Sequence, residues 1–403
     1  MDPAICDPQN LLEGLNPQQE KAVKCYRQAL LIGAGAGSGK TRVLTRRIAW
    51  MLAHGIWASS ILAITFTNKA AAEMRERLVS LVGPEAEHMW ISTFHSACVR
   101  ILRRDGKEIG LKSGFSIYDN ADSERLIKLI AADLNFDTKR YTPRMLLGKI
   151  SDCKNSLTSW RDQLKTANCD YTPGQRGYQV GSGDIDEMTA VVYAEYQHRL
   201  ALANAVDFDD LIMRTVELLQ TCPTVSEYYR HKFRYIFVDE YQDTNHAQYV
   251  LVRELSGVDS GEMPDPRQKG AGRVGPSWIT VVGDSDQSIY AFRGADIRNI
   301  QDFEQDFPNA QTIMLEQNYR STQTILDAAN AVIAKNENRK PKKLWSDLGE
   351  GDKIIGYAAD DERQRPGGSR MRSRGSTPRR TSPTGTSPSC TEPTRNRVPW
   401  KRR

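Results

Sequence analysis

Residues 29–45 combine an apolar run with glycines, a lysine and a threonine at a spacing that suits phosphate chemistry. Residues 29–32 predict a short buried strand, the next seven residues (GAGAGSG) a tight turn, and Lys40-Thr41 the start of a helix. Glycines let backbone N–H groups surround phosphate oxygens, and a helix N-terminus adds partial positive charge. An ordinary glycine-rich turn would not need this order, so the stretch predicts a nucleotide phosphate site.

The residue types in this turn have separate expected roles. Lys40 would neutralise the β- and γ-phosphates, and the Thr41 hydroxyl would hold Mg²⁺. The strict P-loop pattern has glycine where Ala34 stands, so the motif is the A-x-x-x-x-G-K-T variant. The residues expected to bind ATP through this loop are Ala34, Gly35, Ala36, Gly37, Ser38, Gly39, Lys40, Thr41 and Arg42.

Two adjacent acids follow a second apolar run. Residues 235–238 (YIFV) predict a buried strand that ends at Asp239 and Glu240. Paired acids in a loop are commonly only solvated, but acids at the tip of a buried strand in a P-loop protein form the Walker B arrangement. Asp239 would hold Mg²⁺ through water, and Glu240 would orient and deprotonate the attacking water.

Four further side chains are candidates for the nucleotide site. The Gln19 amide can read an adenine edge, and the Tyr319 ring can lie on a purine face. Gln287 follows a strand predicted at 278–282 and can sense the γ-phosphate, while Arg320 follows a strand predicted at 312–315 and can reach phosphate oxygens. Each has a solvated or packing role as its alternative, and their combination favours the functional one.

Predicted strands at 61–66 and 89–92 also end in polar and aromatic residues. Aromatic rings there can stack on bases, and hydroxyl or amide groups can contact phosphates. The alternatives are core packing for Phe66 and Phe94 and a hydrogen-bonded structural role for His95. The candidate DNA contacts are Thr65, Phe66, Asn68, Thr93, Phe94, His95, Tyr290 and Phe292.

The elements that must position these side chains are strands alternating with helices, which predicts an α/β fold with function at the strand ends. Helix-period apolar residues between 115 and 205 predict a mainly helical insertion, whose Lys and Arg suit either DNA contact or a solvated face. Residues 256–276 are hydrophilic and rich in Gly and Pro, so a surface loop is expected there. A helix at 323–335 and a strand at 353–357 are expected beyond the last motif.

Composition describes a soluble globular protein of two or three domains, with 403 residues, 39% hydrophobic and 26% charged. No apolar run approaches the ~20 residues that span a bilayer, and the acidic N-terminus does not resemble a secretory signal. Seven scattered cysteines without a C-x-x-C pair favour reduced thiols in the cytoplasm and no zinc site. The net charge of +5 comes from the tail, where eleven Arg and one Lys after residue 362 oppose one Glu.

The ordered motifs resemble the superfamily 1 DNA helicases of the Rep/UvrD/PcrA type. The segments that carry the resemblance lie between residues 11 and 360: LNPQQ, AGAGSGKT, TFTNKAA, STFHS, DFDD, VDEYQDTN, GDSDQSIYAFRGA and LEQNYRS. The resemblance implies RecA-like P-loop motor domains with helices on both faces of a parallel sheet. It also implies ATP-driven movement 3′ to 5′ along single-stranded DNA, in DNA repair and replication restart.

Carried over by position, the resemblance supports the roles given above. Gln19 and Tyr319 would hold the adenine, and Gln287 and Arg320 would couple the γ-phosphate to motion. Phe66, Tyr290 and Phe292 would be stacking platforms for the strand; the family often has Trp at position 292. The expected partners are single-stranded DNA and junctions of single- and double-stranded DNA, with repair proteins and the oligomeric state left open and no membrane partner.

The resemblance also implies a domain layout. Residues 1–114 and 206–320 would form two parts of a RecA-like ATP-binding core around a helical insertion at 115–205. Residues 321–360 would begin a second RecA-like domain. Residues 361–403 are rich in Arg, Pro, Ser, Thr and Gly and predict a disordered basic tail, either a frameshifted or truncated end or an arm that grips phosphates.

The family's later motifs, including a second arginine finger, are absent from this tail. Since an arginine finger can be worth ~10³–10⁵ in rate, we expect weak ATP binding, very low hydrolysis and no processive unwinding. A nucleotide- and single-stranded-DNA-binding module without catalysis is the alternative. The helicase portion of a recombination nuclease is a further alternative within the same class.

Overall fold

The computed structural model describes residues 8–26, 28–175, 178, 185–257, 277–290, 294–301, 303–336 and 341–356. Phe292, most of the predicted loop at 256–276 and the whole basic tail at 361–403 lie outside the described residues. The chain divides into two compact units, Met1–Asp352 and Lys353–Arg403. All the elements named below belong to the first unit.

Six parallel strands form the central sheet in the order β3-β2-β6-β7-β1-β8. Every strand predicted before residue 320 is confirmed, with ends that differ by no more than two residues. The strands are β1 (Leu30–Ala34), β2 (Ile61–Thr65), β3 (Trp90–Thr93), β6 (Tyr235–Val238), β7 (Trp278–Gly283) and β8 (Gln311–Leu315). Because all six run in parallel, the loops after them gather at one edge of the sheet.

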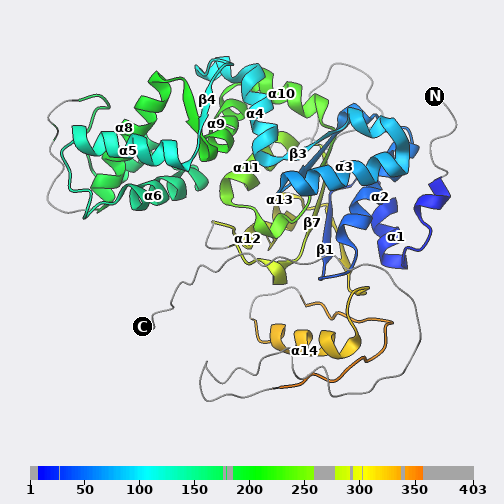
Figure 1. Cartoon of the computed structure of the whole chain (residues 1–403). Coiled ribbons are helices and arrows are strands. Elements are labelled where there is room, and N and C mark those ends of the chain that lie inside the picture. Colours follow the sequence, from blue (N-terminus) through cyan, green and yellow to red (C-terminus); the bar gives the residue numbers. More distant parts are fainter. Residues whose placement is uncertain are drawn as a thin grey trace, which may run out of the picture. The chain divides into compact units, whose positions relative to one another are not determined.

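Helices cover both faces of this sheet (Figure 1). Along β6, Tyr235 and Phe237 belong to one buried hydrophobic cluster, while Ile236 and Val238 belong to the other. The first cluster is closed by α1 (Pro17–Lys24), α2 (Lys40–Ala53) and α3 (Asn68–Val82). The second is closed by α4 (Phe94–Asp105), α9 (Phe208–Thr221), α10 (Pro223–Lys232) and α11 (His246–Ser256). The fold is therefore the predicted α/β class, a RecA-like parallel sheet between two helical layers.

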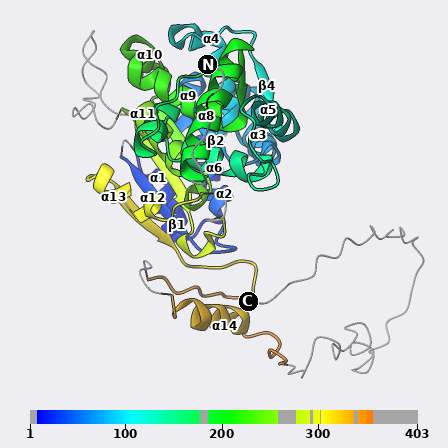
Figure 2. The ribbon, with the colours of Figure 1, turned by 90° about the vertical axis from the view of Figure 1, so that its left-hand side faces the viewer.

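The segment between α4 and α9 is mainly helical and buries a hydrophobic cluster of its own. Its helices are α5 (Asn120–Asp133), α6 (Pro143–Asn155), α7 (Trp160–Thr166) and α8 (Ile185–Leu202). Two short strands, β4 (Ser116–Tyr118) and β5 (Ala205–Asp207), pair in parallel where the segment leaves and rejoins the core. In Figure 2, α6 and α8 lie in front of the strands.

The chain after β7 contributes α12 (Arg298–Gln301), α13 (Phe303–Asp306) and α14 (Gln323–Ile333), the last close to the helix predicted at 323–335. The strand predicted at 353–357 is wrong for residues 353–356, which form no strand. Ile354 and Ile355 are 61% and 91% exposed, so neither side chain gains the burial that would stabilise a strand. Within the described parts of the chain, no helix is both long and apolar enough to cross a membrane.

Candidate functional site

The glycine-rich loop between β1 and α2 has the backbone of a phosphate cradle. Gly37 and Gly39 have φ angles of 67° and 82°, in the left-handed region that side chains rarely adopt. The Ser38 hydroxyl donates to the Gly35 carbonyl over 2.7 Å and braces the turn. No side chain caps the start of α2, so its first N–H groups remain available to an anion.

Helix α1 supports this loop through Gln19, whose side chain is fully buried. Its Nε2 donates to the Ser38 carbonyl over 2.9 Å, and its Oε1 accepts from the Asn16 N–H over 3.1 Å. Gln19 therefore holds the loop in this structure, and contact with an adenine would need the amide to turn. Asn16 also donates to the Tyr319 hydroxyl over 2.9 Å, so the two predicted adenine contacts lie near each other. The Tyr319 side chain is 44% exposed.

The segment after β8 lies against the same loop. Asn318 Nδ2 donates to the Ala36 carbonyl over 2.5 Å, and the Tyr319 N–H donates to the Gly37 carbonyl over 3.0 Å. A Cβ at Gly37 would lie 2.8 Å from the Cβ of Arg320, so the first carbon of the arginine side chain packs against the loop. The structure thus brings Tyr319 and Arg320 to the predicted phosphate site, although they are about 280 residues away in sequence.

The acidic loop after β6 faces the P-loop lysine. Lys40 Nζ lies 3.2 Å from Glu240 Oε2. Asp239 is buried, and its Oδ1 accepts the Glu240 N–H over 3.0 Å. Glu240 has a φ of 50°, an uncommon conformation for a residue with a side chain. The sheet order therefore brings together Lys40, Asp239 and Glu240 as the motifs predicted.

Burial makes this loop an unfavourable place for negative charge. It raises the pKa of Asp239 to about 6, and the neighbouring Glu240 carboxylate adds to the shift. The same two causes raise the pKa of Asp243 to about 6. Lys40 acts in the opposite direction on both carboxyl groups. A cation bound here would relieve the repulsion that remains.

The protein oxygens at this site could hold Mg²⁺ only together with oxygens from phosphate and water. Carboxylate and hydroxyl oxygens are the ligands that Mg²⁺ prefers, and Asp243 Oδ1 is buried without a hydrogen-bond partner in the described structure. The described residues contain no group of three His, Cys, Asp or Glu side chains able to hold a metal by themselves. Thr41 would therefore hold Mg²⁺ directly and Asp239 through water, and phosphate and water would supply the remaining oxygens.

Gln242 connects the acidic loop to the loop after β7, a contact that the sequence analysis missed. Its Nε2 donates to Glu240 Oε2 over 2.9 Å, and its Oε1 accepts the Asp284 N–H over 3.0 Å. Gln287 in turn donates through Nε2 to the Asp284 carboxylate. The position of Gln242 two residues after the paired acids is the sequence feature that could have predicted this contact.

Lys342 is a second residue that sequence reasoning missed. Its side chain is 4% exposed, is paired with Asp284 and lies 3.1 Å from Asp286 Oδ2. Leu344, two residues after Lys342, packs closely on Gly35. A Cβ added at position 35 would clash with the Leu344 side chain. The segment that follows α14 therefore covers part of the glycine-rich loop.

The predicted DNA contacts divide into buried and accessible residues. Phe94 is 2% exposed and belongs to the core, contrary to its predicted stacking role. Thr65 and Thr93 are also buried, and their hydroxyls bond within the chain, Thr65 to the Thr67 carbonyl and Thr93 to Ser96. Their side chains hold the strand ends instead of facing a ligand.

The remaining candidates are accessible to different degrees. Phe66 is half-buried and meets Phe94 edge-on, with 5.7 Å between ring centroids. Asn68 is exposed at the start of α3, and Tyr290 is 37% exposed. His95 is half-buried against the Phe208 ring, and burial lowers the pKa of its imidazole, which favours the neutral form.

Comparisons with known proteins agree with this geometry. Residues 15–308 match the UvrD/REP helicase N-terminal domain, and residues 313–366 match the UvrD-like helicase C-terminal domain. The chain is 57% identical over 354 residues to the ATP-dependent DNA helicase UvrD1 of Mycobacterium tuberculosis (strain ATCC 25618 / H37Rv), which covers 87% of this chain and 43% of the relative. It is 52% identical over 353 residues to the ATP-dependent DNA helicase PcrA of Bacillus subtilis (strain 168), again 87% of this chain and 44% of the relative.

The similarity extends through the site. Every motif described above lies within the matched residues 15–366. The chain spans less than half the length of these curated relatives. A match of the N-terminal model over most of the chain, supported by relatives above 50% identity, shows that the chain belongs to the UvrD/REP helicase family.

Proposed function

We propose that this chain binds ATP weakly with Mg²⁺ and couples slow hydrolysis to 3′ to 5′ movement on single-stranded DNA, as an impaired helicase of DNA repair and replication restart. The observation that carries the proposal is the pairing of Lys40 with Glu240 over 3.2 Å. This pairing joins a phosphate-binding loop to an acid that can act as a base. The names of the relatives support a helicase, and the direction and the pathway rest on the family resemblance.

The chain's own residues divide the chemistry among them. The loop N–H groups and Lys40 would bind the phosphates, and Arg320 would stabilise charge on the transferred phosphoryl group. Glu240 would orient the attacking water and accept its proton. Mg²⁺ would neutralise charge that develops on the phosphate oxygens. Gln242 and Gln287 would couple a change in the position of Glu240 or of the phosphates to the loop after β7, which carries Tyr290.

Tyr290 and Phe66 are the proposed stacking contacts for DNA, and Asn68, two residues after Phe66, is the proposed contact for phosphates. Both rings follow strands of the same parallel sheet, so they lie at the edge where the nucleotide loop also ends. Stacking suits movement along any sequence because every base offers a π-face. Binding of DNA at this edge can therefore influence the hydrolysis site directly.

Steady-state ATP hydrolysis with and without single-stranded DNA tests the proposal. We expect slow, Mg²⁺-dependent hydrolysis that rises with DNA and is lost in Lys40→Ala. Lys21→Ala, a lysine on the exposed side of α1, is the matched control and should retain the activity. ATP binding without DNA-stimulated hydrolysis in the folded protein would instead favour the noncatalytic binding module.

A further inference from the structure

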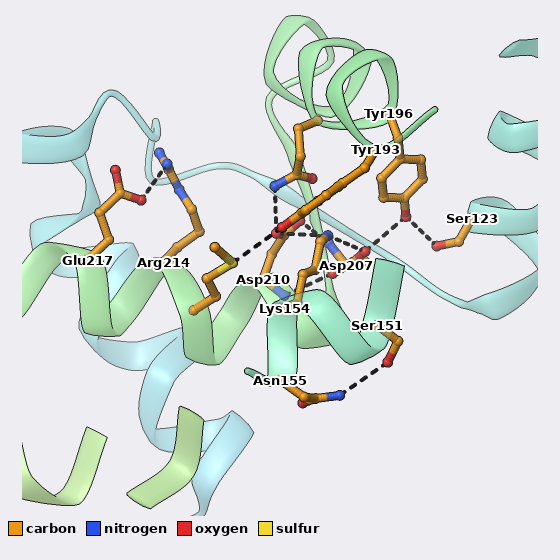
Figure 3. Close-up of polar contacts among 12 residues, drawn as sticks. Ser123, Ser151, Lys154, Asn155, Tyr193, Tyr196, Asp207, Asp210, Arg214 and Glu217 are labelled. Carbon is orange, nitrogen blue, oxygen red and sulfur yellow. Dashed lines mark hydrogen bonds and ion pairs between the residues drawn. The ribbon is translucent and has the colours of Figure 1, made fainter. Parts of the chain in front are cut away.

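A buried ion cluster joins the helical insertion to the core (Figure 3). Lys154, near the end of α6, has a fully buried ammonium group that lies 2.6 Å from Asp207 Oδ2 and 2.9 Å from Asp210 Oδ1. Asp207 caps the start of α9, and the Asp210 N–H donates to it over 2.8 Å. The cluster therefore fixes the last turn of α6 to the first turn of α9.

Neighbouring side chains add hydrogen bonds around the two carboxylates. The Tyr196 hydroxyl lies 3.0 Å from Asp207 Oδ2 and 2.9 Å from Ser123 Oγ, while Gln197 Nε2 donates to Asp210 Oδ1 over 2.9 Å. Removing either partner would leave a charge buried without its counter-ion, which is strongly unfavourable, so the ion pairs hold α6 against α9. The end of α6 is thus a rigid part of the structure and not a freely moving tip.

The next residue, Asn155, reaches from this rigid point toward the hydrolysis site. Its Oδ1 accepts a hydrogen bond from Asn245 Nδ2 over 2.7 Å, and its Nδ2 donates to Ser151 Oγ on its own helix over 3.2 Å. Asn245 caps α11 through a capping box with Gln248. It also ends the loop that begins with Asp239 and Glu240.

The residue before Asn245 is where the two functional loops meet. The Thr244 carbonyl accepts from the Asp296 N–H over 3.0 Å and from Asn299 Nδ2 over 2.8 Å. Asp296 and Asn299 follow the loop that carries Tyr290. A shift of Asn245 would therefore move the end of the acidic loop and the end of the proposed DNA loop together.

We propose that Asn155 is a positioning residue for the hydrolysis site, holding Asn245 and thereby the loop of Glu240 in register with the helical insertion. This inference rests on the proposed function. Lys154 anchors the helix, and Asn155 transmits its position through one amide–amide hydrogen bond. Asn155 is not one of the residues proposed to bind nucleotide or DNA, so its expected effect falls on the geometry of the loop and not on ligand affinity.

Three variants separate this role from a merely structural one. Asn155→Ala removes both hydrogen bonds. Asn155→Asp keeps the oxygen that accepts from Asn245. Ser151→Ala removes the bond to Asn155 and the hydrogen bond from Ser151 to Asp209 on α9, and it leaves the Asn155–Asn245 bond in place. We expect Asn155→Ala to lower kcat of DNA-stimulated ATP hydrolysis about tenfold, the scale of one hydrogen bond, with KM for ATP within about twofold. The other two variants should keep kcat within about twofold of the original chain.

Hydrogen–deuterium exchange of residues 239–250 gives a readout that does not depend on hydrolysis. Exchange should rise in Asn155→Ala and stay unchanged in Asn155→Asp and Ser151→Ala. Unchanged exchange in Asn155→Ala overturns the inference, and so does raised exchange with unchanged kcat. If the original chain hydrolyses no ATP, the proposed function fails, and exchange alone decides whether Asn155 holds the loop.

Discussion

Replacing Asp239 with asparagine tests whether the buried negative charge of Asp239 destabilises the folded protein. Burial first and Glu240 second raise the pKa of Asp239 to about 6. An aspartate in an unfolded chain titrates near pH ~3.9, so the folded state binds this proton more tightly. Ionisation of Asp239 therefore lowers the free energy of unfolding progressively as the pH rises from ~3.9 to about 6. This loss of stability is complete above the folded pKa and absent below the unfolded pKa. At 1.36 kcal/mol per pKa unit, it amounts to about 3 kcal/mol at pH 7.5 and about 1.5 kcal/mol at pH 5.

An amide at this position removes the charge and keeps an oxygen that can accept the Glu240 N–H, now bonded over 3.0 Å. Asp239→Asn should therefore raise the free energy of unfolding of the nucleotide-free protein by up to about 3 kcal/mol at pH 7.5 and by half as much at pH 5. Urea denaturation followed by circular dichroism at both pH values measures the two differences. The same variant should lose Mg²⁺-dependent stabilisation by ATP.

Asp296→Asn is the control with the opposite sign. Hydrogen bonds from Arg298 lower the pKa of Asp296, so its charge stabilises the folded state above its unfolded pKa and this contribution fades as the pH falls. This variant should lose stability at pH 7.5. The reasoning about Asp239 is refuted if Asp239→Asn is less stable than the original chain at pH 7.5, or if its gain is the same at both pH values.

Three other substitutions, one of them with a matched control, have expected outcomes. Lys154→Met should lower the free energy of unfolding by about 3–5 kcal/mol, measured by urea denaturation, because it leaves two buried carboxylates without their counter-ion. Gly37→Ala should raise KM for ATP several-fold, since its Cβ would lie 2.7 Å from Asn318 Nδ2; Gly55→Ala, with a similar φ of 84° and open space, should cost only about 1 kcal/mol of strain and leave KM unchanged. Phe94→Ala should lower stability by about 3–5 kcal/mol, and a change in DNA affinity at unchanged stability would contradict its placement in the core.

The strands and the polar residues at their ends could be predicted because fully buried parallel strands are continuous apolar runs. The orientation of a single ring could not be predicted in the same way. Phe66 and Phe94 each follow a threonine that ends a strand, so the pattern treats them alike. Thr93 caps a helix that begins at Phe94 itself, and this turns the second ring into the core.

Contacts between distant segments were also beyond local patterns. Lys342 meets Asp284 across 58 residues, and Asn155 meets Asn245 across 90. The residues next to Lys342 or Asn155 in the sequence do not specify these partners. Each contact depends on how the tertiary fold brings distant segments to the same edge of the sheet. The P-loop and the acidic loop were predictable across a longer separation only because each has a recognisable motif at a strand end.

Two unfavourable features of the structure lie side by side in the acidic loop. Asp239 carries a charge that burial opposes, and Glu240 holds a left-handed backbone conformation that costs about 1–2 kcal/mol. Together these cost about 4–5 kcal/mol at pH 7.5, and a ligand that binds only the folded state at a thousand times its Kd returns about 4.1 kcal/mol. The loop is thus destabilising without a cation and close to neutral with one. This balance explains why the proposed metal ligand and the proposed base sit where the fold itself would prefer neither.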